Sequence, residues 1–367
     1  MASCASAAGE AVRGCRAFTY DALPSRVIFG HGTAPRLQEE ASSLGIKRAL
    51  VITTPEQGCT GQRARDWLGD RFATCFPGAR MHTPLATTEM ALDVVASNDV
   101  DGFVAIGGGS TVGLSKALSL RTGLPQIAVP TTYAGSEMTP ILGETRDGVK
   151  MTRRNREILP DVVIYDIDLT LGLPARMSAV SGINAMAHAV EALYAPDANP
   201  IISMMAEAGL AALARALPRI MEEPGNRDAR ADALYGAWLG GACLGAVGMS
   251  LHHKLCHVLG GSFDLPHAET HAVILPHAVA YNAGATDAMA IVARAIGSKC
   301  APEGLFALGR RLGIPASLAA LGMPESGIET AADLAVQNSY PNPRPIERED
   351  VRDLIARAYR GEPPIPV

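Results

Sequence analysis

The hydrophobic pattern of the chain changes near residue 170. Before that point, short apolar runs rich in β-branched residues stand between Gly, Pro or Asp, at Arg48–Thr53, Gly102–Ile106, Gln126–Val129 and Val162–Tyr165. Runs of this length predict buried strands of a parallel sheet. Amphipathic helix patterns alternate with them, at Thr33–Leu44 and Arg63–Phe72. This alternation predicts an α/β domain with a doubly wound, mostly parallel sheet, which binds ligands at the carboxyl ends of its strands.

After residue 170 the β-branched runs give way to long helical stretches rich in Ala, Leu and Met. The clearest are Ser178–Ala195, Ile201–Met221, Ala229–Val247 and Thr286–Ile296, and Pro or Gly stands at their boundaries. A length of 367 residues favours two domains. We therefore expect a loose N-terminal arm (1–16), a dinucleotide-binding α/β domain (17–170) and an all-α substrate domain (171–367).

Composition and charge narrow the class of protein. The net charge of −5 does not suggest a nucleic-acid surface, and no apolar run is long enough to predict a membrane span. The first 16 residues lack the apolar core of a secretory signal. The seven cysteines are scattered without a CxxC pair, which argues against a disulfide framework or a thiolate zinc site. We expect a cytoplasmic protein.

A glycine-rich turn follows the predicted strand Gly102–Ile106 and precedes a helix pattern, Val112–Leu120. Glycine lets backbone N–H groups approach a phosphate, and a helix N-terminus adds partial positive charge. Such turns also occur for steric reasons, and this one is not the GxGxxG fingerprint, but its strand–turn–helix context favours a dinucleotide site. A second polar turn, at 130–137, would lie at the same sheet edge. The cofactor contacts predicted from these turns are Gly107, Gly108, Gly109, Ser110, Thr111, Thr131 and Thr132.

Histidines cluster in the second half of the chain, where seven of the nine fall between residues 188 and 277. Asn184 and His188 are four residues apart on one predicted helix, and His253 and His257 repeat that spacing on another. His267 follows a proline in a predicted loop; His252, His271 and His277 complete the set. A single histidine is usually structural, but a cluster predicts a pocket. A carboxylate at position 184 would make this a divalent-metal site, whereas Asn is a poor ligand. The imidazoles would then act as hydrogen-bond donors or general acids.

These segments together resemble the iron-containing alcohol dehydrogenase superfamily, in its maleylacetate reductase branch. The resemblance extends from Phe18 to Ala358. The motifs that carry it are RVIFGHG (26–32), GGGSTVGLSKA (107–117), PTTYAGSEMT (130–139), the stretch from Asn184 to Ala195, and HHKLCHVLGGSFDLPHAETHAVILPHAVAYN (252–282). It implies a dinucleotide-binding α/β domain, a helical domain and an active site in the cleft between them.

The resemblance also assigns roles to individual positions. The metal ligands of metal-dependent members, one Asp and three His, match Asn184, His188, His253 and His267, and His257 matches a histidine near the nicotinamide. Asn at position 184 is the departure that the reductase branch shows, so no metal is expected. Many members carry an acidic residue after the second strand for the adenosine ribose; Thr53 and Thr54 stand there instead. We therefore expect NADH, NADPH or both as cofactor.

The activity implied is reduction of the C=C bond of maleylacetate, plain or chlorinated, to 3-oxoadipate in the breakdown of aromatic compounds. Hydride would attack the carbon β to the ketone, and His253, His188 and His267 would stabilise the charge on the ketone oxygen. One of them, or His257, would supply the proton. The substrate is a small dicarboxylate, and its predicted contacts are Asn184, Thr132, Tyr133 and Lys254, although Lys254 points roughly 100° away from His253 on a helix. A homodimer is expected from the resemblance.

Three other functions stay open at this stage. The first is a metal-dependent alcohol or polyol dehydrogenase of the same superfamily, against which Asn184 argues. The second is a dinucleotide-binding sensor without catalysis, which would not need a histidine pocket. The third is a lyase or synthase on the related dehydroquinate synthase architecture.

Overall fold

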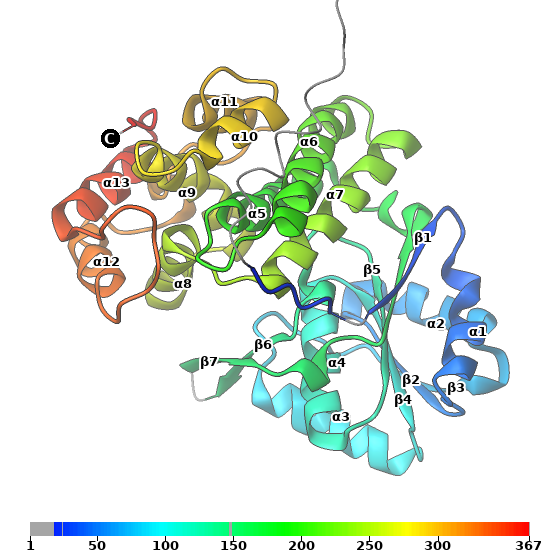
Figure 1. The fold of residues 1–367 in the computed structure, drawn as a ribbon. Coiled ribbons are helices and arrows are strands. Elements are labelled where there is room, and N and C mark those ends of the chain that lie inside the picture. The colour runs from blue at the N-terminus through cyan, green and yellow to red at the C-terminus, as the bar shows by residue number, and fades with distance from the viewer. Residues whose placement is uncertain (1–17, 24, 147–148, 367) are drawn as a thin grey trace, which may run out of the picture.

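The computed structural model describes residues 18–23, 25–146 and 149–366, and the predicted N-terminal arm, residues 1–16, lies outside them (Figure 1). Its α/β part is built on a six-stranded sheet in the order β1-β8-β5-β4-β2-β3, and every neighbouring pair is parallel. The strands are β1 (Arg26–Gly30), β2 (Ala49–Ile52), β3 (Phe72–Phe76), β4 (Gly102–Gly107), β5 (Gln126–Pro130) and β8 (Val162–Asp166). This confirms the predicted doubly wound α/β fold.

The two faces of the sheet bury alternate residues of each strand, as the period of two requires. Val51 and Val104 pack with the cluster under helices α1 (Leu37–Ser43) and α2 (Gly58–Leu68). Leu50 and Phe103 pack on the opposite face. That face is covered by α3 (Leu85–Ser97) and α4 (Gly109–Thr122). A separate antiparallel hairpin, β6 (Ile141–Arg146) and β7 (Val149–Arg154), was not predicted.

The four predicted strands correspond to β2, β4, β5 and β8, but two predictions near the start of the chain need correction. The helix expected over Arg63–Phe72 ends at Leu68, because Gly69 adopts a positive φ of 55° and breaks the helix. Phe72 instead begins the edge strand β3. The helix expected over Thr33–Leu44 opens with a 3₁₀ turn (Ala34–Arg36), and α1 itself is shorter.

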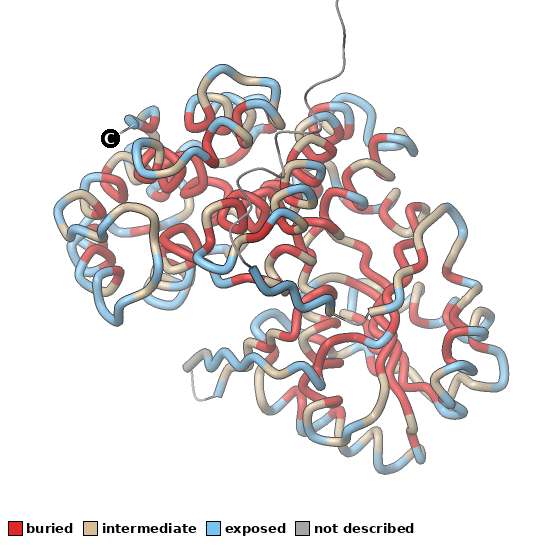
Figure 2. The backbone as a smooth tube through the Cα atoms, in the orientation of Figure 1, coloured by how far each residue is buried: buried red, intermediate tan, exposed pale blue. Residues whose placement is uncertain are grey.

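The rest of the chain is helical, and α5 (Ala175–Leu193) is its central helix, with buried residues on all sides (Figure 2). Four helices match the predicted ones: α5, α6 (Pro200–Glu222), α7 (Arg227–Ala246) and α10 (Ala288–Ala295). The side chain of Asn199 caps the N-terminus of α6, and that of Asn226 caps α7. The others are α8 (Leu251–Phe263), α9 (His267–Asn282), α11 (Ala301–Arg311), α12 (Gly327–Ala335) and α13 (Arg348–Arg360). His267 is thus the first residue of a helix, not part of a loop as predicted.

Helix α6 is by length and composition apolar enough to cross a membrane, and the bent pair α7–α8 passes the same test only if taken together. In this fold α6 packs against α5 and α7. Its outer side carries ion pairs from Glu207 to Arg294 and from Arg215 to Asp232. An apolar face against neighbouring helices and a charged face outside are typical of a core helix in a folded domain.

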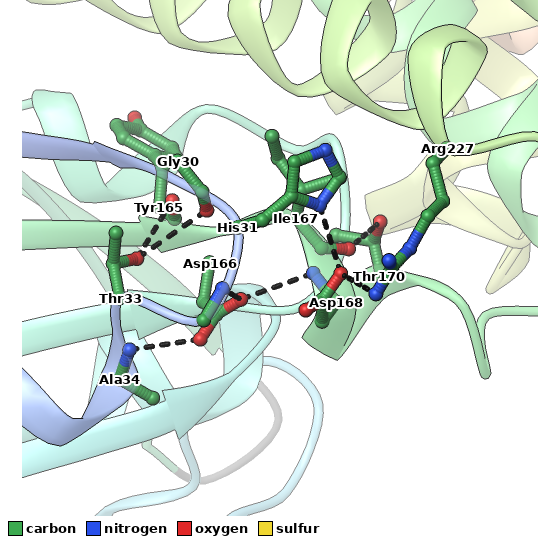
Figure 3. Close-up of polar contacts among 11 residues, drawn as sticks. Gly30, His31, Thr33, Ala34, Tyr165, Asp166, Ile167, Asp168, Thr170 and Arg227 are labelled. Carbon is green, nitrogen blue, oxygen red and sulfur yellow. Dashed lines mark hydrogen bonds and ion pairs between the residues drawn. The ribbon is translucent and has the colours of Figure 1, made fainter.

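Polar contacts join the carboxyl end of the sheet to the helical part (Figure 3). Asp166, at the end of β8, accepts the backbone N–H groups of Gly32 (3.0 Å) and Ala34 (2.8 Å). Asp168 lies 2.9 Å from Nδ1 of His31 and 2.7 Å from Nη2 of Arg227, at the start of α7. The carboxyl end of the sheet, where the turns after the parallel strands begin, therefore faces the helices.

Candidate active site

The glycine-rich turn lies where the order of the sheet reverses. The chain moves outward from β2 to β3 and then returns to β4 on the other side of β2, so the crevice lies at the carboxyl ends of β2 and β4. Gly108 precedes α4 as its N-cap, Gly109 is exposed, and Ser110 is half-buried. Free N–H groups at the start of a 14-residue helix could hold the pyrophosphate of a dinucleotide.

Gln57 links the turns that follow β2 and β5, and sequence reasoning missed it. Its Nε2 donates to Oγ1 of Thr131 (2.8 Å), and its Oε1 lies 3.5 Å from Oγ1 of Thr54. A Cβ at Gly107 would lie 2.6 Å from the same Oε1 and 2.7 Å from Cγ2 of Thr111, and the φ of Gly107 is +151°, so this position favours glycine. The sequence separation of 74 residues between Gln57 and Thr131 explains why no local motif marked this contact.

The structure separates the predicted cofactor contacts into two groups. Gly108, Gly109, Ser110, Thr132 and Thr54 are half-buried or exposed. Gly107, Thr53, Thr111 and Thr131 are buried. The hydroxyl of Thr111 donates to the carbonyl of Gly108 (2.8 Å), so it stabilises the turn and is not free to bind phosphate. Thr131 accepts a hydrogen bond from Gln57, whereas the buried hydroxyl of Thr53 has no partner.

The histidines of α5, α8 and α9 converge as the spacing predicted. The rings of His188 and His253 lie 5.2 Å apart, and that of His257 lies 6.5 Å from His253. His267 packs against His271 at 4.3 Å, and His271 lies 5.1 Å from His253. Several buried ring nitrogens of the cluster have no partner, among them Nδ1 of His188 and Nε2 of His253, and Oδ1 of Asn184 is also unpartnered. These atoms mark the interior of the pocket.

Glu191 is a fully buried carboxylate beneath this pocket, and the sequence analysis did not single it out. Its Oε2 lies 2.7 Å from Nδ1 of His253, and its oxygens accept the backbone N–H groups of Ser250 (2.9 Å) and His252 (2.7 Å). Because a carboxylate only accepts, Nδ1 of His253 carries a proton and Nε2 presents its lone pair to the pocket. Glu191 therefore orients His253 and also satisfies the N-terminus of α8.

His271 belongs to the predicted histidine set, but the sequence analysis gave it no role. It is buried, its ring contacts those of His252 (4.9 Å), His253 and His267, and neither of its ring nitrogens has a partner. Its place at the centre of the cluster could have been expected from its i+4 spacing to His267 once α9 was known.

Burial keeps most of the cluster uncharged. It lowers the pKa of His252 to about 4 and that of His253 to about 3, and the neighbouring imidazoles add to the effect. The pKa values of His188 and His271 fall well below the usual range for the same reason. Burial raises the pKa of Glu191, and its hydrogen-bond donors oppose that shift. His257, by contrast, is exposed.

Two predicted substrate contacts lie away from the pocket. Tyr133 is fully buried, and its hydroxyl accepts a hydrogen bond from Arg230 (3.1 Å), a buried residue of α7. Its structural role is to join the turn after β5 to the helices. Nζ of Lys254 lies 5.8 Å from the centre of the Tyr340 ring, on a different side of α8 from His253. Of the other two predicted contacts, Thr132 is half-buried, and Asn184 is buried with its Oδ1 unpartnered.

The residues at the family's four metal-ligand positions do not fit a divalent ion well. Asn184 stands at the position of the Asp ligand, and its amide is a weaker ligand than a carboxylate. Among the residues that the structure describes, His188, His253 and His267 do not bring three ring nitrogens within 4.8 Å of one another, whereas His252, His253 and His271 do. His267 meets the cluster through His271.

Comparisons with known proteins agree with this geometry. The sequence pattern of the iron-containing alcohol dehydrogenase family matches residues 24–167, and that of its C-terminal part matches residues 178–359. A maleylacetate reductase of Burkholderia cepacia is 56% identical over 349 residues, which cover 95% of this chain and 99% of the relative.

Solved structures give the same result. A putative alcohol dehydrogenase from Ralstonia eutropha superposes with a TM-score of 0.94 at 50% identity, covering 95% of this chain and 99% of that one. The maleylacetate reductase from Agrobacterium tumefaciens superposes with a TM-score of 0.92 at 53% identity, covering 95% and 100%. The chain belongs to the iron-containing alcohol dehydrogenase family, in the group of its maleylacetate reductases.

Proposed function

We propose that this chain reduces the C=C bond of maleylacetate to 3-oxoadipate with NADH or NADPH, in the breakdown of aromatic compounds and without a metal ion. The observation that carries the proposal is a pocket of buried, unpartnered Asn and His atoms without an anionic ligand, in a chain about half identical to maleylacetate reductases. Such a pocket can stabilise charge on a substrate oxygen by hydrogen bonds alone.

The nicotinamide, when bound in the crevice, would supply hydride to the alkene carbon β to the ketone. The residues of this chain then deal with the electron pair that moves to the ketone oxygen. His188 lies buried on α5 with Nδ1 unpartnered, and we assign its Nδ1–H as a donor to that oxygen. Asn184, one turn earlier on the same face, can donate only through Nδ2, because its unpartnered Oδ1 is an acceptor. Preorganised donors in a pocket without water stabilise a developing oxyanion more strongly than water does.

His253 and Glu191 form a buried pair that can take up one further proton. When the Glu191–His253 pair holds one proton, between the carboxylate and Nδ1, the pair is negatively charged and Nε2 of His253 is an acceptor. A second proton makes the pair neutral, and Nε2 then carries a hydrogen and is a donor. The raised pKa of Glu191 favours this second proton. We assign Nε2–H of His253 to the ketone oxygen and His257, which is exposed to solvent, to proton delivery at the adjacent carbon. Hydride and proton together complete the reduction.

The decisive experiment mixes EDTA-treated protein with NADH and freshly prepared maleylacetate and follows the nicotinamide absorbance. Prompt oxidation of NADH that chelator leaves unchanged would support both the activity and the metal-free pocket. Turnover that requires added iron or zinc would keep the activity but contradict the metal-free pocket. Absence of turnover with and without metal would contradict the proposal, and a screen of small alcohols and aldehydes would follow.

Cofactor choice follows from the turn after β2. Thr53 and Thr54 bring no carboxylate there, so the 2′-phosphate of NADPH meets no repulsion from these positions. We expect similar KM values for NADH and NADPH. A KM for NADPH far above that for NADH would contradict this assignment.

We also propose a cytoplasmic homodimer. β1 and β3 are the edge strands of the sheet, and β1 pairs only with β8 in the described part of the chain. A sedimentation mass near twice the chain mass of 38.3 kDa would support the dimer, and a mass near 38.3 kDa would contradict it.

A further inference from the structure

Three histidines of the cluster direct ring nitrogens at one another. His252 and His253 stand at the start of α8, and His271 stands in the second turn of α9. One ligand atom from each lies within 4.8 Å of the other two, and all three residues are buried. Only His253 belongs to the four positions at which metal-dependent relatives hold their ion, so this is a different set of ligands.

The partners of these rings leave lone pairs pointing inward. Nδ1–H of His253 donates to Glu191, and Nε2–H of His252 donates to the carbonyl of His271 (3.0 Å). The protons of these two rings therefore lie on Nδ1 of His253 and Nε2 of His252. Nε2 of His253, Nδ1 of His252 and both ring nitrogens of His271 are buried without a partner. Unpaired buried acceptors are costly, and a cation among them would satisfy all three.

The surroundings resemble the outer shell of a metal site. A ring that ligates a metal usually donates its other N–H to a carboxylate or a backbone carbonyl, and here His253 and His252 do one each. Glu191 supplies a negative charge directly behind His253.

We propose that His252, His253 and His271 form a three-histidine site for a divalent transition metal of the zinc, cobalt and nickel class. Three imidazoles with an open fourth position are an established zinc geometry. Zinc–nitrogen bonds of about 2 Å place ligand nitrogens about 3.3 Å apart, so the rings close on the ion by small side-chain rotations. An ion bound at this site would use the lone pair of Nε2 of His253, so this nitrogen could no longer contact the substrate. The ion therefore inhibits the reductase, and this last step rests on the proposed function.

The test measures metal binding directly. Full-length protein is stripped with EDTA, freed of chelator and titrated with Co²⁺, whose visible absorption reports coordination by nitrogen; Zn²⁺ equilibrium dialysis gives the stoichiometry. We expect one ion per chain. His252→Gln and His271→Asn should each weaken binding at least about tenfold. Thermal unfolding and NADH binding establish that each variant is folded.

His188→Asn and His267→Asn are the matched controls, because they remove the two family positions that the proposed site does not use. His277→Asn removes a buried histidine of α9 whose ring contacts Phe306 instead of the cluster. All three should bind Co²⁺ as the unchanged chain does. Loss of binding in His188→Asn and His267→Asn, with binding retained in His271→Asn, would place the ion in the family's set and overturn the proposal, as would absence of binding in the unchanged chain.

A second measurement separates this proposal from the proposed function. Zn²⁺ should slow NADH oxidation with maleylacetate, EDTA should restore it, and the inhibition should be weaker in His271→Asn. Metal binding without any reductase activity would refute the proposed function and leave the site intact. Reductase activity with metal bound at these residues but no inhibition would refute the inhibitory step.

Discussion

Glu191 and His253 form the pair on which the chemistry of the pocket depends. The carboxylate is fully buried 2.7 Å from Nδ1 of His253, and it also accepts two backbone N–H groups at the start of α8. It therefore acts in two ways, by fixing the tautomer of a catalytic ring and by satisfying buried donors. Two variants separate these effects.

His253→Ala removes the group that we assign to the ketone oxygen. We expect kcat/KM with maleylacetate to fall at least about tenfold, equivalent to about 1.4 kcal/mol of transition-state stabilisation. Steady-state kinetics with NADH held at saturation measures this. His277→Ala, on a buried histidine outside the cluster, is the control for general effects of losing an imidazole. A value of kcat/KM near that of the unchanged chain would refute the role of His253.

Glu191→Gln keeps the shape of the side chain but cannot hold the second proton of the pair. We expect kcat to fall at least about tenfold. Activity of the unchanged chain should decline as the pH rises and the pair loses its proton, and this alkaline limb should disappear in the variant. A pH profile of kcat measures both. An unchanged alkaline limb would show that Glu191 does not share the proton.

Glu191→Ala tests the structural role of the same residue, which is to accept buried backbone N–H groups at the start of α8. It leaves the N–H groups of Ser250 and His252 buried without acceptors, at a cost of about 1–3 kcal/mol each. We expect a lower midpoint of urea unfolding than in Glu191→Gln, which retains an acceptor. Equal midpoints for the two variants would contradict the capping role.

At the scale of elements, the turn between β4 and α4 combines packing with ligand binding. Gly107 has a φ of +151°, and a Cβ there would lie 2.6 Å from Oε1 of Gln57 and 2.7 Å from Cγ2 of Thr111. Gly109 has room, because the nearest atom to its Cβ would be Oγ of Ser136 at 3.8 Å. Packing and backbone conformation therefore favour glycine at position 107 but leave space for a side chain at position 109.

Gly107→Ala should destabilise the fold by about 1–3 kcal/mol through backbone strain and close contacts. Gly109→Ala should leave stability unchanged but raise the Kd for NADH at least about tenfold, because the methyl group stands where a pyrophosphate would approach the helix. Urea unfolding and NADH fluorescence titration measure the two effects. Unchanged NADH binding in Gly109→Ala would place the phosphates elsewhere.

At the scale of the molecule, burial of many neutral histidines makes stability depend on pH. The pKa of His252 and that of His277 are lowered to about 4, and those of His188, His253 and His271 are also lowered. In the unfolded chain these histidines become protonated near pH 6.5, whereas in the folded chain they become protonated near pH 4 or below. The raised pKa values of Glu137 and Glu191 act in the opposite direction, but they are fewer.

The free energy of unfolding should therefore fall as the pH falls from about 6.5 to about 4, with each such histidine adding up to about 1.4 kcal/mol per pH unit. Urea unfolding at a series of pH values measures the slope. His277→Asn should reduce the slope without touching the pocket. A stability that is constant through this range would show that the histidines are protonated in the folded chain.

Elements with a local signal could be predicted from the amino-acid sequence. β2, β4, β5 and β8 are uninterrupted apolar runs between turn residues, and α5, α6 and α7 are long helices, so periodicity is sufficient for both. The glycine turn was visible because it lies directly between a strand and a helix. The histidine pocket was visible because Asn184 and His188, and His253 and His257, share helix faces at a spacing of four.

Contacts between side chains of different elements could not be predicted, because they depend on how those elements pack. Glu191 and His253 are 62 residues apart, and Gln57 and Thr131 are 74 apart, so their contacts depend on how helices and turns pack. The edge strands β1 and β3 and the hairpin β6–β7 were also missed. β3 is short and apolar, but the helix predicted before it was extended into its first residue, Phe72. Spacing within a helix fixes which side chains share a face. The packing of α8 against α5 and α9 fixes which faces meet, and that places Glu191 and His271 at the centre of the site.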